Sequence, residues 1–336
     1  MNFHKMFKNI ALYVVFFALG GFLVYLYLTY SVLPNKISEI RSTPLRLRVT
    51  SPLISPLLLS QDNPKTALQD DFMKKVNDYI NKKTADKSAT MISFYYRNLD
   101  TALFGEVNSK ETFAPASLMK VPIMIAILKE SEKNPNLLNK KIYFDGKIDL
   151  NGEEHYKSEV KIIGGNYYTV KELMKYMISY SDNNATNLLF KLVPPDAIPN
   201  LFINLKLPLP TPDAGGSSDF MSADLYSRLL RILYNSTYLS EDDSILALTL
   251  LSDSDFSQGI VSGVPQGVIV AHKFGERTVY ESDGKTVSSE ELHDCGIVYK
   301  SSAPFLICVM TRGNSFDSLS KIISDLTKLS YDNTGL

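Results

Sequence analysis

The sequence contains no tryptophan and only four histidines among its 336 residues. The histidines show none of the close pairings, such as His-x-x-x-His, that hold a catalytic zinc ion. Neither sign of charge is in excess, because 35 lysines and arginines face 36 aspartates and glutamates, and there is no block of basic residues. A metal-dependent hydrolase and a nucleic-acid-binding protein are therefore disfavoured. We expect no metal ion, no cofactor and no nucleic-acid partner.

Cysteine is also scarce, since Cys295 and Cys308 are the only two. They flank an expected hairpin turn around Ser301 and Ser302. A location outside the cytoplasm would permit a disulfide, because oxidising conditions let such bonds persist. Cross-strand neighbours are uncommon disulfide sites, however, and small buried thiols are common. A bridge and a pair of free thiols both stay open at this point.

Charge is absent from one long stretch near the N-terminus, which runs from Asn9 to Asn35 and is mostly aliphatic and aromatic. It exceeds the roughly 20 residues that cross a bilayer and the roughly 7–15 apolar residues of a cleavable signal. We therefore expect a short cytoplasmic tail over 1–8 and an uncleaved transmembrane signal anchor over 9–33. Basic residues lie on both sides of the run, so charge gives no orientation. The remaining chain is expected outside the cytoplasm because the chemistry described below belongs there.

After the anchor, the chain divides into a spacer and one large domain. Prolines and serines over 34–63 indicate an extended spacer. The domain is expected over 64–336, beginning with a helix whose apolar residues recur every four positions. Two strands follow, then a helical subdomain over about 114–262, then three strands and a last helix. This order predicts an α+β fold, in which N- and C-terminal helices flank an antiparallel sheet and an all-helical subdomain is inserted.

The first candidate catalytic residue is Ser117, in the string Ser-Leu-Met-Lys. A serine hydroxyl is a weak nucleophile and needs a neighbouring base. Positions three apart on a helix share a face, so Lys120 can serve as that base. The free N–H groups at a helix start also favour negative charge developing on an attacked carbonyl. Ser158–Lys161 and Ser318–Lys321 have the same spacing, but only Ser117 follows a strand pair and opens an apolar helix.

A second polar string, Ser181-Asp182-Asn183, stands where a helix is expected to end. Ser181 could pass a proton between Lys120 and a leaving nitrogen, and the Asn183 amide could hold a substrate carbonyl. Asp182 is expected to tie the loop backbone together rather than to act in the chemistry. The alternative is ordinary cap and turn chemistry, which these three residue types also favour.

The third string is Lys273-Phe274-Gly275, within an apolar strand. A charge there would be costly unless the lysine lay at the strand's exposed end or faced a polar cleft. Gly275 would let a substrate backbone approach closely. The backbone N–H of Glu276 would then act with that of Ser117 as an oxyanion hole.

Together these strings resemble class A β-lactamases and the related penicillin-binding proteins, from about Asp71 to the C-terminus. The likeness extends to the surrounding segments FAPASLMKVPIMIAIL, YTVKELMKYMISYSDNNATNLL, MSADLYSRLLRIL and HDCGIVYKSSAPFLICVMTRG. The resemblance implies an acyl-serine hydrolase. It also implies the roles of five residues: Ser117 as the acylated nucleophile, Lys120 as its base partner, Ser181 as the proton shuttle, Asn183 as a substrate clamp and Lys273 as the cation on the carboxylate side.

The largest departure from the family pattern concerns deacylation. Class A β-lactamases use an omega-loop glutamate to activate the deacylating water, and no glutamate lies between Asn187 and Ser222. The corresponding loop, LKLPLPTPDAGGSSDF, contains only Asp213 and Asp219 as acids. Asp213 could stand in as the base.

Two further departures concern the substrate carboxylate. Phe274 takes the place of the family's threonine, which removes a hydroxyl that would bind that carboxylate. Cys295 takes the place of an arginine on the neighbouring strand, although Arg277 could reach the same region. We therefore include Arg277 among the candidate substrate-binding residues.

The sequence thus predicts a membrane-tethered, extracytoplasmic serine hydrolase. It would cleave the amide of a β-lactam or of a peptidoglycan-like peptide through an acyl-serine intermediate. Slow deacylation is expected because the omega-loop glutamate is missing. The alternative is a penicillin- or cell-wall-fragment-binding sensor that uses the same pocket without turnover. The sequence makes no prediction of the oligomeric state.

Overall fold

The computed structural model describes residues 51–54, 71–152, 154–209, 218–301 and 303–334. The expected tail and anchor, almost all of the spacer, and Asp213 lie outside these residues. Within them, no helix combines the length and the hydropathy needed to cross a membrane. The anchor and the location therefore stay predictions.

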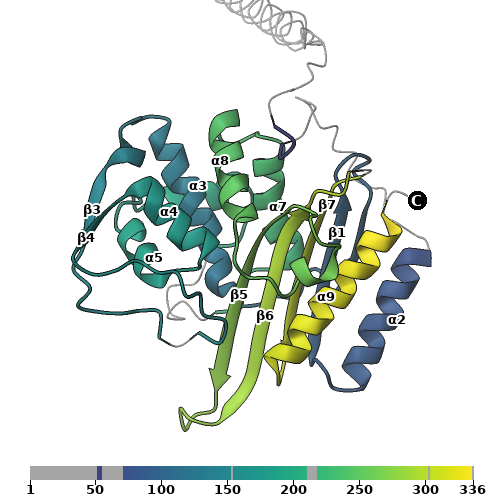
Figure 1. The fold of residues 1–336 in the computed structure, drawn as a ribbon. Helices are drawn as coiled ribbons and strands as arrows, with labels where there is room; N and C mark the ends of the chain where they lie inside the picture. Colours follow the sequence, from purple (N-terminus) through teal and green to yellow (C-terminus); the bar gives the residue numbers. More distant parts are fainter. Residues whose placement is uncertain (1–50, 55–70, 153, 210–217, 302, 335–336) are drawn as a thin grey trace, which may run out of the picture. The chain divides into compact units, whose positions relative to one another are not determined.

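The described part of the chain has an α+β fold built on a five-stranded antiparallel sheet (Figure 1). The strand order is β2-β1-β7-β6-β5, so strands from the two ends of the domain pair with each other near its centre. This confirms the predicted α+β fold on an antiparallel sheet, with two early and three late strands. The bounds are β1 Met91–Asn98, β2 Phe104–Val107, β5 Val270–Tyr280, β6 Val287–Val298 and β7 Phe305–Gly313.

Helices α2 (Asp71–Ala85) and α9 (Phe316–Asn333) cover one face of this sheet (Figure 1). α2 presents Phe72, Val76 and Ile80 to that face, and all three side chains are buried. Burial of one side chain of this kind stabilises a fold by about 1.5–3 kcal/mol. The four-residue spacing in the sequence is thus the buried stripe of an amphipathic helix.

The opposite face of the sheet packs against the region inserted between β2 and β5. Cys308 and Met310 of β7, for example, share one hydrophobic core with Leu229 and Leu233. The helices of this region are η3 Ala116–Met119, α3 Lys120–Ser131, η4 Leu137–Asn139, α4 Val170–Ser179, α5 Asn183–Phe190, α6 Ala197–Asn204, α7 Ala223–Tyr234, α8 Glu241–Ser252 and η6 Val261–Gly263.

The inserted region is not all helical, which corrects our expectation. β3 (Lys141–Phe144) and β4 (Asn166–Thr169) form a two-stranded antiparallel sheet within it. A long connection, rather than a two-residue turn, joins these strands, so the pairing leaves no hairpin signature in the sequence. β4 ends where Thr169 caps α4, in a capping box with Glu172.

Cys295 and Cys308 lie directly opposite each other on β6 and β7 and form a disulfide. Of the two alternatives left open by the sequence, a disulfide bridge and a pair of free thiols, the structure has the bridge. Because side chains alternate between the two faces of a sheet, a one-residue slip would send the two sulfur atoms to opposite faces. The bond therefore fixes the register of two central strands.

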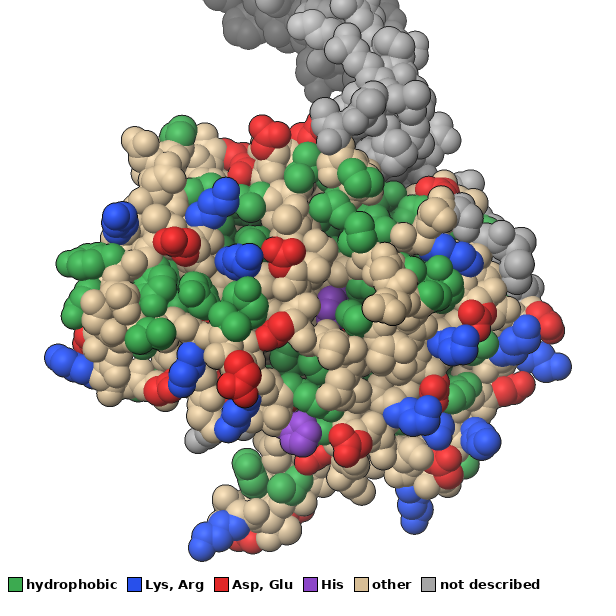
Figure 2. All heavy atoms as spheres, in the orientation of Figure 1, with side chains coloured by type: hydrophobic (Ala, Val, Ile, Leu, Met, Phe, Trp, Pro, Cys, Tyr) green, Lys and Arg blue, Asp and Glu red, His purple; other side chains and the backbone are tan. Residues whose placement is uncertain are grey.

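Both signs of charge are present on the face of the molecule seen in Figure 2. Figure 2 shows acidic and basic side chains interspersed over one face, without a block of one sign. Apolar side chains are exposed on the small β3–β4 sheet, where Tyr143 packs on Tyr167 with ring centroids 5.0 Å apart.

Candidate active site

Ser117 lies in the short 3-10 helix η3, directly before α3, and its side chain is partly exposed. The helix predicted to open at this serine therefore begins with a 3-10 turn. η3 packs against the outer strand β5 at Gly275, where a Cβ would come within 2.8 Å of the Pro115 carbonyl oxygen. A side chain at this position would push the two segments apart. The candidate nucleophile thus stands at the start of a buried helix, beside an edge of the sheet.

Two residues at the site have a left-handed backbone. Ala116 has a φ of 48° and Ser181 a φ of 55°. Non-glycine residues adopt this region at a cost of about 1–3 kcal/mol, and such residues persist where the surrounding structure holds them. One strained residue, Ala116, directly precedes Ser117, and the other is Ser181 itself. Backbone strain is therefore found next to or at each serine of the site.

Lys120 is the centre of a hydrogen-bonded cluster. Its side-chain nitrogen Nζ donates to the Ser181 carbonyl oxygen at 2.5 Å, to Ser181 Oγ at 3.0 Å and to Asn183 Oδ1 at 2.7 Å. An ammonium group has three N–H bonds, so all of its donors are used. Lys120 must lose a proton before it can accept one from Ser117.

Lys273 reaches the same serine from the other wall of the site. It is fully buried on β5, and its Nζ donates to Ser181 Oγ at 3.0 Å. A serine hydroxyl can accept two hydrogen bonds and donate one. The two lysines fill both acceptor positions, so the Ser181 proton is left to point at a third group. That arrangement suits a proton shuttle.

The electrostatics of the cluster favour a neutral amine. Burial lowers the pKa of Lys120 from 10.5 to about 8, although the carboxylates of Glu154, Asp182 and Glu276 partly oppose this effect. Burial, followed by the neighbouring charge of Lys120, holds the pKa of Lys273 well below its usual value. An amine with a depressed pKa can act as a general base near neutral pH.

Asn183 forms hydrogen bonds to residues 150–154 of its own chain, so its side chain does not face an open substrate site. Its side-chain amide donates to the Leu150 carbonyl oxygen at 3.1 Å and to a carboxylate oxygen of Glu154. Its backbone N–H donates to Asn151 Oδ1 at 2.6 Å. Sequence reasoning missed Glu154, because no motif marks it and its partners are distant in the chain.

Asp182 anchors the loop, as predicted. Its two carboxylate oxygens accept from the backbone N–H groups of Ala185, at 2.9 Å, and Ile162, at 2.7 Å. The side chain is buried and serves as the N-cap of α5. Both oxygens are therefore engaged in holding backbone.

Glu276 follows Gly275 on β5, so its backbone N–H is carried close to η3. An oxyanion hole formed by this N–H and that of Ser117 stays a prediction. The side chain of Glu276 accepts from the backbone N–H of His155 at 2.6 Å and of Tyr156 at 3.1 Å. Burial raises the pKa of this carboxyl group.

Phe274 alternates with Lys273 along β5, yet the side chains of the two residues meet, because Lys273 Nζ lies 4.1 Å from the centre of the Phe274 ring. Its ring stacks on Phe256 with centroids 4.1 Å apart, in the core beneath α9. The residue that stands in place of the family's threonine thus contributes to core packing.

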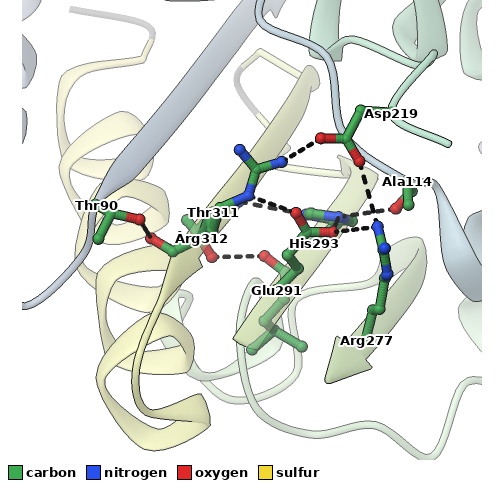
Figure 3. A network of polar contacts seen from close by, with 9 residues as sticks. Thr90, Ala114, Asp219, Arg277, Glu291, His293, Thr311 and Arg312 are labelled. Atoms are coloured by element: carbon green, nitrogen blue, oxygen red, sulfur yellow. Dashed lines mark hydrogen bonds and ion pairs between the residues drawn. The ribbon is translucent and has the colours of Figure 1, made fainter. Parts of the chain in front are cut away.

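Arg277 lies in a network of charged residues that spans three strands (Figure 3). It forms ion pairs with Asp219 at 3.3 Å and with Glu291 at 3.7 Å. Arg312 on β7 binds the same two carboxylates, each at 2.6 Å. Asp219 is thereby held to the sheet by two arginines. Binding of a substrate by Arg277 stays a prediction.

His293 joins this network to the segment that leads into Ser117 (Figure 3). Burial lowers its pKa to about 3, so the ring is neutral. Nε2 lies 3.1 Å from the Ala114 carbonyl oxygen, and Nδ1 accepts from the backbone N–H of Thr311 at 3.3 Å. The neutral ring with its proton on Nε2 satisfies both contacts. Ala114, three residues before Ser117, is thus braced against β6.

The structure brings most of the predicted site residues together. Lys120, Ser181, Asn183 and Lys273 form one hydrogen-bonded cluster, and Gly275 packs against the turn that carries Ser117. Within the described part of the chain, no side-chain hydrogen bond joins Ser117 to Lys120, whose donors are directed at Ser181 and Asn183. Among the described residues no group of three His, Cys, Asp or Glu side chains could hold a metal ion.

Comparison with known proteins identifies this arrangement. Residues 71–334 match the family described as the Beta-lactamase enzyme family. A β-lactamase of Phocaeicola vulgatus is 24% identical over 235 residues, which cover 61% of this chain and 67% of the relative.

Two solved structures show the same fold. The extended-spectrum β-lactamase TLA-3 has a TM-score of 0.67 at 20% identity, covering 79% of this chain and 100% of that one. A mutant of PBP-A, solved as an acyl-enzyme complex with penicillin G, has a TM-score of 0.65 at 18% identity, covering 80% and 97%.

The chain belongs to the Beta-lactamase enzyme family. It is a β-lactamase-like serine hydrolase, as the three polar strings predicted.

Proposed function

We propose that this protein cleaves the amide bond of a β-lactam, or of a peptidoglycan-like peptide that ends in a carboxylate, through an acyl-enzyme on Ser117. The observation that carries the proposal is the cluster in which Lys120 and Lys273 share the hydroxyl of Ser181 next to the turn of Ser117. Such a cluster supplies a base and a proton donor to one side of a nucleophile.

Acylation begins when the neutral amine of Lys120 removes the proton from Ser117 Oγ. The oxygen attacks the amide carbonyl, and the backbone N–H groups of Ser117 and Glu276 stabilise the developing oxyanion. The Ser181 hydroxyl gives its proton to the amide nitrogen as the C–N bond breaks. The Lys120 ammonium, which hydrogen-bonds to Ser181, then returns to it the proton taken from Ser117. The product is an ester on Ser117 together with an amine, which leaves when the substrate is a peptide and stays attached to the acyl group when the substrate is a β-lactam.

Deacylation is proposed to be slow. A water molecule that hydrolyses the ester needs a base, and the family's omega-loop glutamate is missing. Asp219 has both carboxylate oxygens engaged with Arg277 and Arg312, so it is a poor replacement. Asp213 is the remaining acid of that loop.

We further propose that the domain is tethered to a membrane by 9–33 and faces an extracytoplasmic space. The uncharged run in the sequence supports this location. The disulfide between Cys295 and Cys308 fits an oxidising compartment.

Intact-protein mass spectrometry after exposure to penicillin G tests the proposal. Wild-type protein should gain the mass of one penicillin and lose it over time, while Ser117→Ala should gain none. Equal labelling of the two proteins, or no labelling of the wild type, would reject acylation at Ser117. A wild-type adduct that never decays would favour the sensor over the enzyme.

A further inference from the structure

Asn183, the residue proposed to bind the amide carbonyl of the substrate, is already bound by other residues of its own chain. The Asn183 side-chain amide has two N–H bonds, and these are donated to Leu150 and Glu154. Asn183 Oδ1 is bound to Lys120. No donor of this amide is left for a substrate carbonyl.

Residues 154–156 bridge the two walls of the site. On one wall, Glu154 binds Asn183 at the start of α5. On the other wall, Glu276 on β5 accepts the backbone N–H groups of the next two residues, His155 and Tyr156. Figure 1 shows the connection between β3 and β4 running down to β5. We name residues 154–156 the strap.

The far end of the strap is anchored beyond β5. The Tyr156 ring packs edge-on against Phe256 at 5.0 Å and against Phe316 at 6.0 Å. The His155 ring stacks on Phe316 at 4.7 Å. Phe256 and Phe316 belong to the core beneath α9, together with Phe274. The strap therefore crosses the outer edge of β5, where Gly275 meets the turn of Ser117.

Glu154 lines two cavities at the site. It lines a cavity of about 210 Å³ together with Ser181, and it lines a second cavity of about 500 Å³ together with Asn183 and Glu276. Its second carboxylate oxygen is buried and makes no hydrogen bond to any described residue. A carboxylate in this position is attracted by the charge of Lys120 but is only half satisfied by hydrogen bonds.

We propose that the strap is an internal competitor for the substrate, with Glu154 in the place that the substrate's amide carbonyl must take on Asn183. A substrate reaches Ser117 only after Glu154 leaves Asn183 and the strap swings off β5. This inference rests on the proposed acylation of Ser117. It makes strap release, rather than attack by Ser117, the step that limits acylation of the resting enzyme.

The test compares Glu154→Ala with wild type by the second-order rate of labelling with a fluorescent penicillin. Loss of a hydrogen bond to a charged group should raise this rate by about tenfold. Glu281→Ala is the matched control, because Glu281 is an exposed glutamate directly after β5 that lines neither cavity, and it should label at the wild-type rate. Tyr156→Ala removes the other anchor and should also speed labelling.

Hydrogen exchange gives a second readout that needs no substitution. The amide protons of His155 and Tyr156, bound to Glu276 in the free protein, should exchange faster once Ser117 carries penicillin.

The proposal that the strap competes with the substrate would be overturned if Glu154→Ala labelled at or below the wild-type rate. Unchanged exchange after acylation would also overturn it. Slower release of the adduct in Glu154→Ala, at an unchanged labelling rate, would also overturn it and would make Glu154 a deacylation base. Failure of every variant to label would instead reject the proposed function.

Discussion

Lys120 and Lys273 donate to the same atom, the hydroxyl oxygen of Ser181, each across 3.0 Å. The two lysines come from opposite walls of the site, one from the start of α3 and one from β5. Two buried ammonium groups on one oxygen repel each other, and burial lowers the pKa of both. The site therefore holds a proton acceptor close to neutral pH without any histidine.

The first prediction concerns pH. The active form of Lys120 is the neutral amine, and its pKa of about 8 means that this form grows as pH rises through that value. The labelling rate of Ser117 should therefore increase between about pH 6 and pH 9, with its midpoint near pH 8, and level off above that range. Labelling by fluorescent penicillin across this range measures the profile. A flat profile would mean that another group removes the proton.

The second prediction concerns Ser181. Ser181→Ala removes the oxygen shared by two lysines and the proposed proton donor, so acylation should slow by about 10²–10⁴-fold. Ser179→Ala is the control, because Ser179 is a buried serine nearby whose hydroxyl binds only the Leu250 carbonyl oxygen among the hydrogen bonds described. The control should acylate at the wild-type rate, and similar rates for both variants would contradict the shuttle.

The third prediction concerns the close approach at Gly275. A Cβ at this position would lie 2.8 Å from the Pro115 carbonyl oxygen and 3.1 Å from the Leu118 nitrogen. Gly275→Ala should move η3 away from β5, and the displaced backbone should cost both acylation rate and about 1–3 kcal/mol of unfolding free energy. Chemical denaturation and penicillin labelling measure the two effects, and a variant with wild-type values of both would contradict this contact.

The fourth prediction compares two carboxylates of the charge network. Glu291 is buried between Arg277 and Arg312, whereas Asp219 is partly exposed. Glu291→Gln takes the buried charge away from two partly exposed arginines and should cost about 2 kcal/mol of unfolding free energy, the value of a hydrogen bond to a charged group. Asp219→Asn should cost about 1 kcal/mol, because solvent screens the outer pair. Urea denaturation of both variants checks the order, and a larger loss for Asp219→Asn would reverse it.

Much of the fold and site could be predicted because the informative signals are local. The spacing of Ser117 and Lys120, the cap residue Asp182 and the charged Lys273 in an apolar strand each constrain a short stretch of chain. The fold alone brings these short stretches together in space, and the resemblance to a known family predicted that they would lie in one site. The cluster around Ser181 agrees with it.

The parts that could not be predicted depend on long irregular segments. Glu154 lies in the connection between β3 and β4, and its meeting with Asn183 follows from the path of that connection rather than from any periodicity. The same holds for Asp219, because its two arginine partners, Arg277 and Arg312, are distant from it in the chain. The hydrogen bonds from Lys120 to Ser181 and Asn183 likewise join residues that are more than 60 positions apart, so the spacing of Ser117 and Lys120 gives no sign of them.

The pairing of β1 with β7 has a consequence for biogenesis. β7 lies between β1 and β6 in the sheet, yet the whole inserted region and both β5 and β6 stand between β1, which ends at Asn98, and β7, which begins at Phe305. A ribosome must therefore synthesise all of these elements before the sheet can close. Contacts of such large sequence separation form slowly. Until they form, the early strand β1 has an open edge that a chaperone would have to shield.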